Sequence, residues 1–339
     1  MDRRQLLIGA VAGGISLAGY VATTGYMKSL ADPAWDLSVR RYQQYGPAAA
    51  LQAITPNDNF YVTTKGGTPR VDAASWSLKI DGLVANPVEL NYAQVLAEPR
   101  IEQEMTLECI SNTIGGHDIG NARWTGTPLK SLVERARPTS KATHAIIYAA
   151  DDYSTGHPIE RIWNDTNFLS YRMNGVDLPP EHGYPMRVFI PGKFGMKQPK
   201  WITRIKFTDR PYMGFWESRG WTNDAERWAQ ARFTDPRDGA KVSGRGITLY
   251  GYAVGNLDGI KAVQLSFDNG RTWQDADIYS NPSPLVWSFW KFEWITARRG
   301  RRQIRARAID GKGRIEGADP KGIYPNGATG LQEIEIDAI

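Results

Sequence analysis

Apolar and polar residues alternate over many short stretches of the chain, and this period-2 pattern predicts a protein built mainly from β-strands. Before residue 216 the predicted strands are 59–62, 76–80, 106–107, 144–149, 188–191 and 202–207. Two short helices are expected among them. One lies at the end of residues 87–96, and the other starts at residues 125–128, after which apolar residues recur at helical spacing.

The last hundred residues show the strand pattern alone. Residues 247–254, 263–267, 290–294 and 304–308 are predicted strands, and Asp268-Asn269-Gly270 has the composition of a hairpin turn. Short strands separated by such turns are typical of an immunoglobulin-like sandwich. Residues 216–235, rich in Trp, Arg and Asn, show neither period and are predicted to be irregular.

These patterns divide the chain into predicted parts, and a length of 339 residues is sufficient for two domains. The predicted fold class is α+β. The division is an export segment at 1–31, a connector at 32–53, a mixed α/β domain at 54–215, an inter-domain segment at 216–235 and an all-β immunoglobulin-like domain at 236–339.

Composition is ordinary for a folded protein, with 41% hydrophobic and 23% charged residues. The formal net charge is +5. Residues 1–31 contain Arg3, Arg4 and Lys28 against Asp2, a net charge of +2, so the remainder carries +3. This small charge, without a basic helix or an RNA-binding signature, argues against nucleic acid as a partner.

The N-terminus has the organisation of an export signal. Arg3 and Arg4 precede 21 uncharged residues, Leu6 to Tyr26, and the small residues before Ala31 suit cleavage after it. Adjacent arginines suggest the twin-arginine route. The alternative is an uncleaved anchor, because 21 uncharged residues can reach across a bilayer core. The expected location is the periplasm, or the outer face of the inner membrane in the anchored alternative.

The stretch from Met105 to Trp124 holds the single cysteine of the chain, Cys109. It follows a predicted strand and precedes Gly115 and Gly116, which permit irregular backbone. This setting suits a metal ligand or a nucleophile, and a buried free cysteine is an equally good interpretation of the local sequence. An exported protein with one cysteine forms no internal disulfide, which favours a sulfur committed to a cofactor.

Residues 192–200 combine glycines with Lys193, Lys197 and Lys200 before a predicted strand. Backbone N–H groups and ammonium groups in such a loop can bind a phosphate. The loop matches no nucleotide-binding fingerprint, so on these residues alone a solvated surface turn is the preferred interpretation.

Several separated motifs resemble, in the same order, those of the sulfite oxidase family of molybdenum–molybdopterin oxidoreductases. They are NFYV, TLECISN, SYRMNG and HGYPMRVFIPGKFGMKQPKW, followed by the predicted sandwich. The resemblance covers roughly residues 57–310. The family includes bacterial sulfite dehydrogenases and a periplasmic protein-methionine-sulfoxide reductase. It implies a molybdenum–molybdopterin cofactor and a dimerisation-type immunoglobulin-like domain, which makes a homodimer an expectation.

The resemblance also implies roles for particular residues. Cys109 matches the cysteine whose thiolate ligates molybdenum, and Tyr171 matches a catalytic tyrosine near the metal. The residues that match cofactor-binding positions are Asp58, Tyr61, His182, Arg187, Gln198, Pro199 and Lys200. The alternatives are that His182 only caps a loop and that Tyr171 belongs to the core. Lys193 matches no family position, so replacing it by Glu is expected to be much milder than replacing Lys200.

One departure from the family bears on the substrate. Thr113 follows Asn112 where animal and plant sulfite oxidases have an arginine of the sulfite pocket, and Arg123, Arg172 or His117 are candidates to replace it. The expected reaction is oxygen-atom transfer, with sulfite or a related sulfur compound oxidised. The alternatives are reduction of S-oxides or N-oxides such as methionine sulfoxide, and, in another class, a cofactor-free exported binding protein.

Electron transfer is expected to need a second protein. The sequence contains no Cys-x-x-Cys-His for covalent haem, and one cysteine cannot supply a four-cysteine iron–sulfur cluster. The expected partner is therefore a cytochrome or a membrane haem protein.

Overall fold

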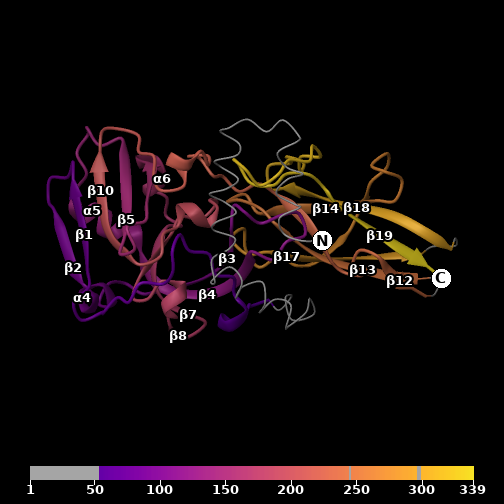
Figure 1. Cartoon of the computed structure of the whole chain (residues 1–339), viewed down its shortest axis with the longest axis horizontal. Coiled ribbons are helices and arrows are strands. Elements are labelled where there is room, and N and C mark those ends of the chain that lie inside the picture. The colour runs from indigo at the N-terminus through magenta and orange to yellow at the C-terminus, as the bar shows by residue number, and fades with distance from the viewer. Residues whose placement is uncertain (1–52, 244–245, 296–298) are drawn as a thin grey trace, which may run out of the picture.

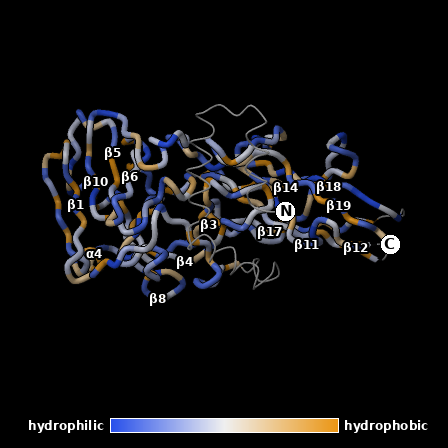
Figure 2. The backbone as a smooth tube through the Cα atoms, in the orientation of Figure 1, coloured by the Kyte–Doolittle hydropathy of each residue, from blue (hydrophilic) through white to orange (hydrophobic). Residues whose placement is uncertain are grey.

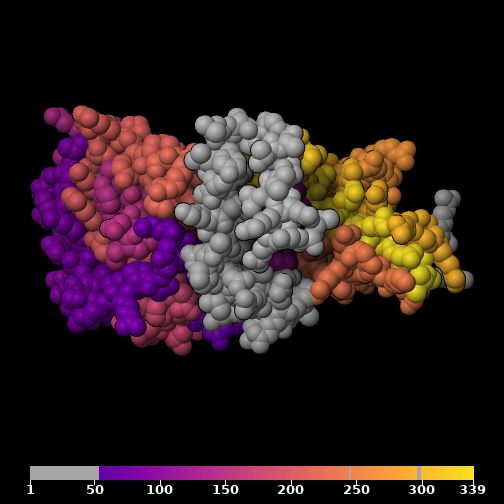
Figure 3. All heavy atoms as spheres, in the orientation of Figure 1, coloured from indigo at the N-terminus to yellow at the C-terminus, as the bar shows by residue number. Residues whose placement is uncertain are grey.

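The computed structural model describes residues 53–243, 246–295 and 299–339. The predicted export segment and nearly all of the predicted connector lie outside these residues. Within them the protein is mostly β-structure, arranged in two parts along one long axis (Figures 1 and 3). No helix among the described residues has the length and apolar character that crossing a bilayer requires.

The first part contains a mixed five-stranded sheet in the order β2-β1-β10-β5-β6. Only β1 and β10 pair in parallel. The strands are β1 (Ser77–Gly82), β2 (Val88–Asn91), β5 (His144–Ala149), β6 (Ser154–Pro158) and β10 (Ile202–Thr208), and the helices are α4 (Tyr92–Leu96), α5 (Leu129–Ala136) and α6 (Ile159–Ile162). Leu129, Leu132 and Val133 of α5 are fully buried in the core, which confirms the helical spacing seen in the sequence.

A second sheet in the first part carries the cysteine. Its path is β3-β4-β7-β8, with β9 also paired to β7. The strands are β3 (Ile101–Glu108), β4 (Ile119–Pro128), β7 (Phe168–Met173), β8 (Val176–Asp177) and β9 (Arg187–Phe189). Cys109 follows directly after β3, as the sequence predicted. The second part of the chain supports this end of β3.

The second part consists of two sheets, ordered β11-β13-β17-β16 and β12-β19-β18-β14-β15. The first has β11 (Gln230–Asp235), β13 (Gly246–Val254), β16 (Asp277–Ser280) and β17 (Ser288–Ile295). The second has β12 (Ala240–Val242), β14 (Ile260–Ser266), β15 (Gln274–Asp275), β18 (Gly300–Asp310) and β19 (Gln332–Ala338). The hydrophobic positions lie largely on the strands (Figure 2), and side chains of both sheets share one core. Asn269 and Gly270 have φ values of 64° and 84°, as the predicted hairpin turn requires.

Two predicted elements differ from the structure. Residues 59–62 are not a strand, because a 3-10 helix, η2 (Asn57–Asn59), is followed by chain that pairs with no sheet and lines a cavity. Residues 216–235 are not irregular throughout, since they contain the 3-10 helix η5 (Glu217–Arg219) and the strand β11. The pattern missed β11, in which the core residues Ala231 and Phe233 alternate with the polar Gln230 and Arg232, themselves only 5% and 2% exposed.

The end of β3 is hydrogen-bonded to the second part of the chain. Thr106 N donates to Leu285 O over 2.9 Å, and Trp287 N donates to the Thr106 hydroxyl over 2.8 Å. Gln230 Nε2 lies 2.6 Å from both carboxylate oxygens of Glu108. The strand that presents Cys109 is therefore held by residues more than a hundred positions away in sequence.

Candidate active site

A cavity of about 140 Å³ lies where the two sheets of the first part meet. Its walls come from residues 61–65, from the turn after β3, from the β5–β6 turn, from residues 195–201 and from two tryptophans near η5. Cys109, Arg187 and Lys200 all line it, although they are far apart in the sequence. The cavity thus brings a thiol and two cations together.

The backbone after β3 turns tightly around Cys109. Its N–H donates to Asp118 O over 2.9 Å, and its carbonyl accepts from Asn112 N over 3.0 Å. The Sγ atom lies 2.9 Å from Ser111 Oγ and 3.8 Å from Thr63 Oγ1. Burial, with a smaller contribution from Asp118, raises the pKa of the thiol to about 11. A bound metal cation would reverse this preference, because it stabilises the thiolate directly.

Arg187 and Lys200 are two of the cations that line the cavity. Arg187 is 3% exposed, and its Nη1 donates to His182 O over 3.1 Å, while its Nε has no hydrogen-bond partner among the described residues. Lys200 Nζ donates to Thr63 O over 3.0 Å and to Glu181 O over 2.8 Å. Burial lowers the pKa of Arg187 to about 10. Burial and the neighbouring Arg187 lower the pKa of Lys200 to about 7.

Among the described residues, these contacts leave Arg187 and Lys200 without a carboxylate at ion-pair distance. Neither Arg187 nor Lys200 forms an ion pair in the described part of the chain, and both bond only to backbone carbonyls. Buried cations without counter-charges are unfavourable, and a bound anion would satisfy them. The open Nε of Arg187 is a further donor for such an anion. The residues present therefore fit a cofactor that carries both a metal and a phosphate.

Seven of the nine residues predicted from the sequence line this cavity, namely Tyr61, Cys109, His182, Arg187, Gln198, Pro199 and Lys200. His182 Nε2 lies 3.2 Å from Asn57 O. Gln198 fixes its own loop, because its side chain donates to Lys193 O over 2.7 Å and accepts from Ile190 N over 3.1 Å. Burial raises the pKa of Tyr61 well above its ordinary value.

The structure does not bring Asp58 and Tyr171 to the cavity. Asp58 lies in η2 and is exposed. Tyr171 lies in β7, is 6% exposed and packs in the hydrophobic core that includes Leu169 and Val188. Strand alternation explains the second case, since the side chain of Tyr171 belongs to the core-facing set of β7. The core placement of Tyr171, which the sequence left open, is the one observed.

The cations proposed to replace the missing arginine also lie elsewhere. Arg123 is paired with Glu104 over 2.9 Å and Arg172 with Asp177 over 3.2 Å, and neither lines the cavity. Burial and the charge of Arg237 lower the pKa of His117 to about 4, so it is neutral at pH 7. The substrate side of the cavity gains no charge from these residues.

Aromatic residues that the sequence did not single out form one wall of the cavity. Trp216 and Trp221 line it, and their ring centroids are 6.5 Å apart. Tyr153 also lines it, and its hydroxyl donates to Met196 O over 2.6 Å. A concentration of Trp in a segment without strand or helix period was the available signal, because such residues seldom remain exposed on a linker.

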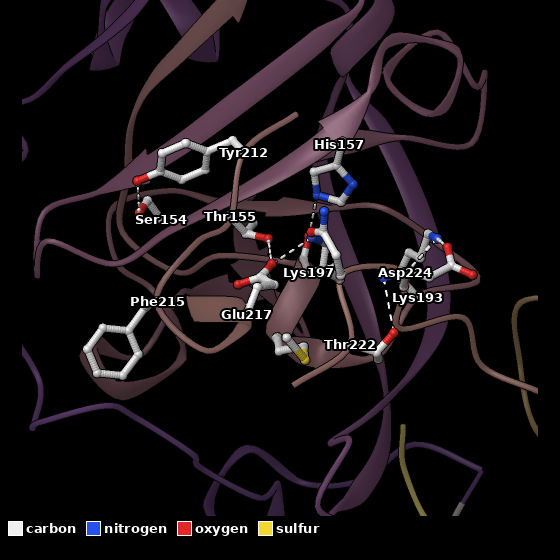
Figure 4. Close-up of polar contacts among 12 residues, drawn as sticks. Ser154, Thr155, His157, Lys193, Lys197, Tyr212, Phe215, Glu217, Thr222 and Asp224 are labelled. Atoms are coloured by element: carbon white, nitrogen blue, oxygen red, sulfur yellow. Dashed lines mark hydrogen bonds and ion pairs between the residues drawn. The ribbon is translucent and has the colours of Figure 1, made fainter. Parts of the chain in front are cut away.

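The loop 192–200 is not a solvated turn, and its first two lysines are paired. Lys193, 5% exposed, contacts Asp224 Oδ1 over 2.7 Å and Glu226 Oε1 over 2.9 Å. Lys197, 1% exposed, contacts Glu217 Oε1 over 2.7 Å (Figure 4). That Lys193→Glu is milder than substitution of Lys200 in its effect on cofactor content stays a prediction. A glutamate there would face two carboxylates in a buried place, so we expect it to destabilise the fold.

Comparisons with known proteins identify the family of the chain. Residues 65–216 match the family described as oxidoreductase molybdopterin binding domain. An uncharacterised oxidoreductase, YuiH of Bacillus subtilis (strain 168), is 32% identical over 186 residues, which are 53% of this chain and 92% of that protein. Sulfite oxidase of Gallus gallus is 27% identical over 315 residues, 78% of this chain and 69% of that protein.

A solved structure has a similar fold. The sulfane dehydrogenase SoxCD from Paracoccus pantotrophus aligns with a TM-score of 0.72 and 23% identity, covering 85% of this chain and 82% of that one. At this identity the likeness concerns the fold. It extends over both parts of the chain, since neither part alone accounts for the covered share.

Proposed function

The chain belongs to the sulfite oxidase family of molybdopterin-binding oxidoreductases, and from this membership we propose that it transfers an oxygen atom to or from a sulfur compound. Its cofactor is molybdenum–molybdopterin. The observation that carries the proposal is one cavity that combines the single thiol of the chain with two cations, Arg187 and Lys200, that form no ion pair with a carboxylate of the described residues.

The residues of the cavity divide into those for the metal and those for the phosphate. Cys109 would ligate the metal, since a thiolate suits it. Arg187 and Lys200 would bind the phosphate through charge-assisted hydrogen bonds. When bound, the cofactor supplies two-electron redox chemistry with oxygen-atom transfer.

The protein itself prepares the ligand and keeps it from water. Ser111 and Thr63 hold the Sγ of Cys109 in place through its side-chain contacts. The hydrogen bond from Asn112 N to the carbonyl of Cys109 closes a tight turn and fixes the backbone of the cysteine. Because Cys109 is only 8% exposed, water and oxidants have little access to its sulfur.

We propose sulfite or a related sulfur compound as the reductant, with electrons passed to a separate cytochrome. Relatives named sulfite oxidase, and a fold neighbour named sulfane dehydrogenase, support a sulfur substrate. The sequence lacks a haem-attachment motif, which supports an external electron acceptor.

A second candidate runs in the reducing direction, on an S-oxide such as methionine sulfoxide. It is favoured by the wall formed by Trp216 and Trp221, here called the tryptophan wall, and by the absence of Arg123, Arg172 and His117 from the cavity lining. An aromatic wall suits a neutral organic group better than an inorganic dianion.

Two assays on the same preparation decide between these reactions. One follows reduction of cytochrome c by sulfite, and the other follows oxidation of a dithionite-reduced dye by methionine sulfoxide. Sulfite turnover supports the first candidate, and sulfoxide turnover without sulfite turnover supports the second. Metal analysis comes first: about one molybdenum per chain is expected, and its clean absence from protein made in a molybdopterin-producing host would favour a cofactor-free binding protein.

We further propose that the protein works outside the cytoplasm, after twin-arginine export or as an anchored protein. The paired arginines and the uncharged segment behind them support this. The second part is proposed to be an immunoglobulin-like domain that forms a homodimer. Cell fractionation and light scattering test the two statements: cytoplasmic protein would contradict the first, and a monomer the second.

A further inference from the structure

A buried ion pair lies directly behind the cavity. Lys197 Nζ and Glu217 Oε1 are 2.7 Å apart, and the two side chains are 1% and 0% exposed. Thr155 of β6 donates its hydroxyl to the same carboxylate oxygen over 2.5 Å, and Lys197 also reaches Asn223 Oδ1 over 3.1 Å. Figure 4 shows Thr155 and Lys197 both directed at the carboxylate of Glu217.

The two partners belong to two different segments whose neighbouring residues line the cavity. Lys197 ends the 3-10 helix η4 (Gly195–Lys197), in the loop that continues to Lys200. Glu217 begins η5, immediately after Trp216 of the aromatic wall. The pair is therefore a direct side-chain connection between the loop proposed to hold the cofactor and the wall that faces a substrate.

Backbone hydrogen bonds also hold the loop 192–200 and the segment that carries Trp216 in their positions. Phe194 N donates to Ala225 O over 2.9 Å, at the start of the loop. At its other end the wall is attached to β6, since Phe215 N donates to Ser154 O over 3.0 Å. A Cβ at Gly214 would lie 2.1 Å from Ser154 O, so glycine is required for this approach. Glu217 thus lies on a segment whose backbone is already fixed against a strand.

A contribution to folding stability does not by itself explain why Lys197 and Glu217 form a buried ion pair. Replacing a buried ion pair by apolar residues of similar volume is often neutral or stabilising. His157 joins this network, since its Nε2 lies 2.9 Å from Lys197 O. Glu217 Oε2 and His157 Nδ1 lack partners among the described residues, so the network is incompletely satisfied. What the pair provides is a defined relative position, because a charged hydrogen bond at 2.7 Å fixes both side chains.

We propose that Lys197 and Glu217 are positioning residues that couple cofactor binding to the order of the tryptophan wall. This inference rests on the proposed binding of the cofactor by the loop that ends at Lys200. A cofactor bound to the loop restrains Lys197, and the ion pair passes that restraint to the segment carrying Trp216. Loading then adds a restraint to the segment carrying Trp216, beyond the backbone contacts that already hold it.

Hydrogen–deuterium exchange of the full chain, with and without cofactor, tests the coupling. In the wild type, loading should slow exchange several-fold both in residues 192–201 and in residues 212–222. In the variant Lys197→Met/Glu217→Gln, loading should still protect the first segment and no longer the second. The matched control is Arg232→Met/Glu316→Gln, which removes a buried pair of the second part, 2% exposed on both sides. In this control, loading should slow exchange in residues 192–201 and in residues 212–222 as much as in the wild type.

The outcomes separate this inference from the proposed function. Equal protection of residues 212–222 in wild type and double variant would overturn the coupling and leave the pair a structural one. Absence of protection in residues 192–201 of the wild type would instead contradict cofactor binding by this loop. If the double variant does not fold, the single variant Glu217→Gln, which keeps the shape of the side chain and removes its charge, takes its place. Loss of protection in residues 212–222 alone would then support the coupling, and unchanged protection there would overturn it.

Discussion

Replacing Lys200 by Met should change the empty and the loaded protein in opposite directions. In the empty protein the ammonium group is withdrawn from water and lies near Arg187, so the charged form is disfavoured and the pKa falls from 10.5 to about 7. Asp151, Glu181 and Cys109 also face it and oppose this shift in part. Removing the charge should therefore stabilise the empty protein.

The magnitude follows from the pKa. A shift of one unit in pKa corresponds to a free-energy difference of about 1.4 kcal/mol between the two protonation states. With allowance for the partial exposure of the side chain, we expect Lys200→Met to raise the free energy of unfolding of the empty protein by about 2–4 kcal/mol at pH 6. The folded protein releases this proton near pH 7, and the unfolded chain releases it near pH 10.5. Between these values the unfolded state binds more protons, so wild-type stability rises with pH and the advantage of the variant shrinks.

In the loaded protein the same substitution removes a charge-assisted hydrogen bond to the phosphate. Such a bond contributes about 1.5–3 kcal/mol, so the cofactor should be held roughly 10- to 100-fold less tightly. Lys200→Glu should be more severe, since it places like charge beside the phosphate.

Urea unfolding of cofactor-free protein at pH 6 and pH 9 measures the first effect, and molybdenum and pterin content after extended dialysis measures the second. Lys141→Met, an exposed lysine away from the cavity, is the control and should change neither. A Lys200→Met protein that is less stable when empty and keeps its molybdenum would refute the placement of the phosphate.

Three further substitutions test other parts of the site. Cys109→Ser should leave a folded chain that still holds pterin and has lost turnover, because an alkoxide is a harder ligand than a thiolate; near-normal activity would mean that Cys109 is not the ligand. Gln230→Leu should lower the free energy of unfolding by about 2–3 kcal/mol in urea titrations, since it removes two 2.6 Å contacts from the buried Glu108. Lys193→Glu should lose more than 3 kcal/mol in the same assay, and Lys193→Met clearly less, because only the first adds a third carboxylate beside Asp224.

Local patterns predicted most strands because their alternation is a property of the strand itself. The predicted strand at 144–149 coincides with β5, and 202–207 with β10 apart from its last residue. The pattern failed where a strand buries polar groups that find distant partners. Arg232 of β11 is the example, since it pairs with Glu316 over 2.8 Å, 84 positions later. No local window contains that partner.

The same limit explains the lysines of the loop 192–200, which looked equivalent in the sequence. Lys193 and Lys197 meet carboxylates from residues 217–226, so their charge is neutralised and their role is to fix the loop. Within the part of the chain that the structure describes, Lys200 donates only to carbonyl oxygens, so its charge remains available to a ligand. Because the distinction depends on which carboxylates the fold brings near, it becomes visible only in three dimensions. The unpaired charge, rather than the density of lysines, marks the anion site.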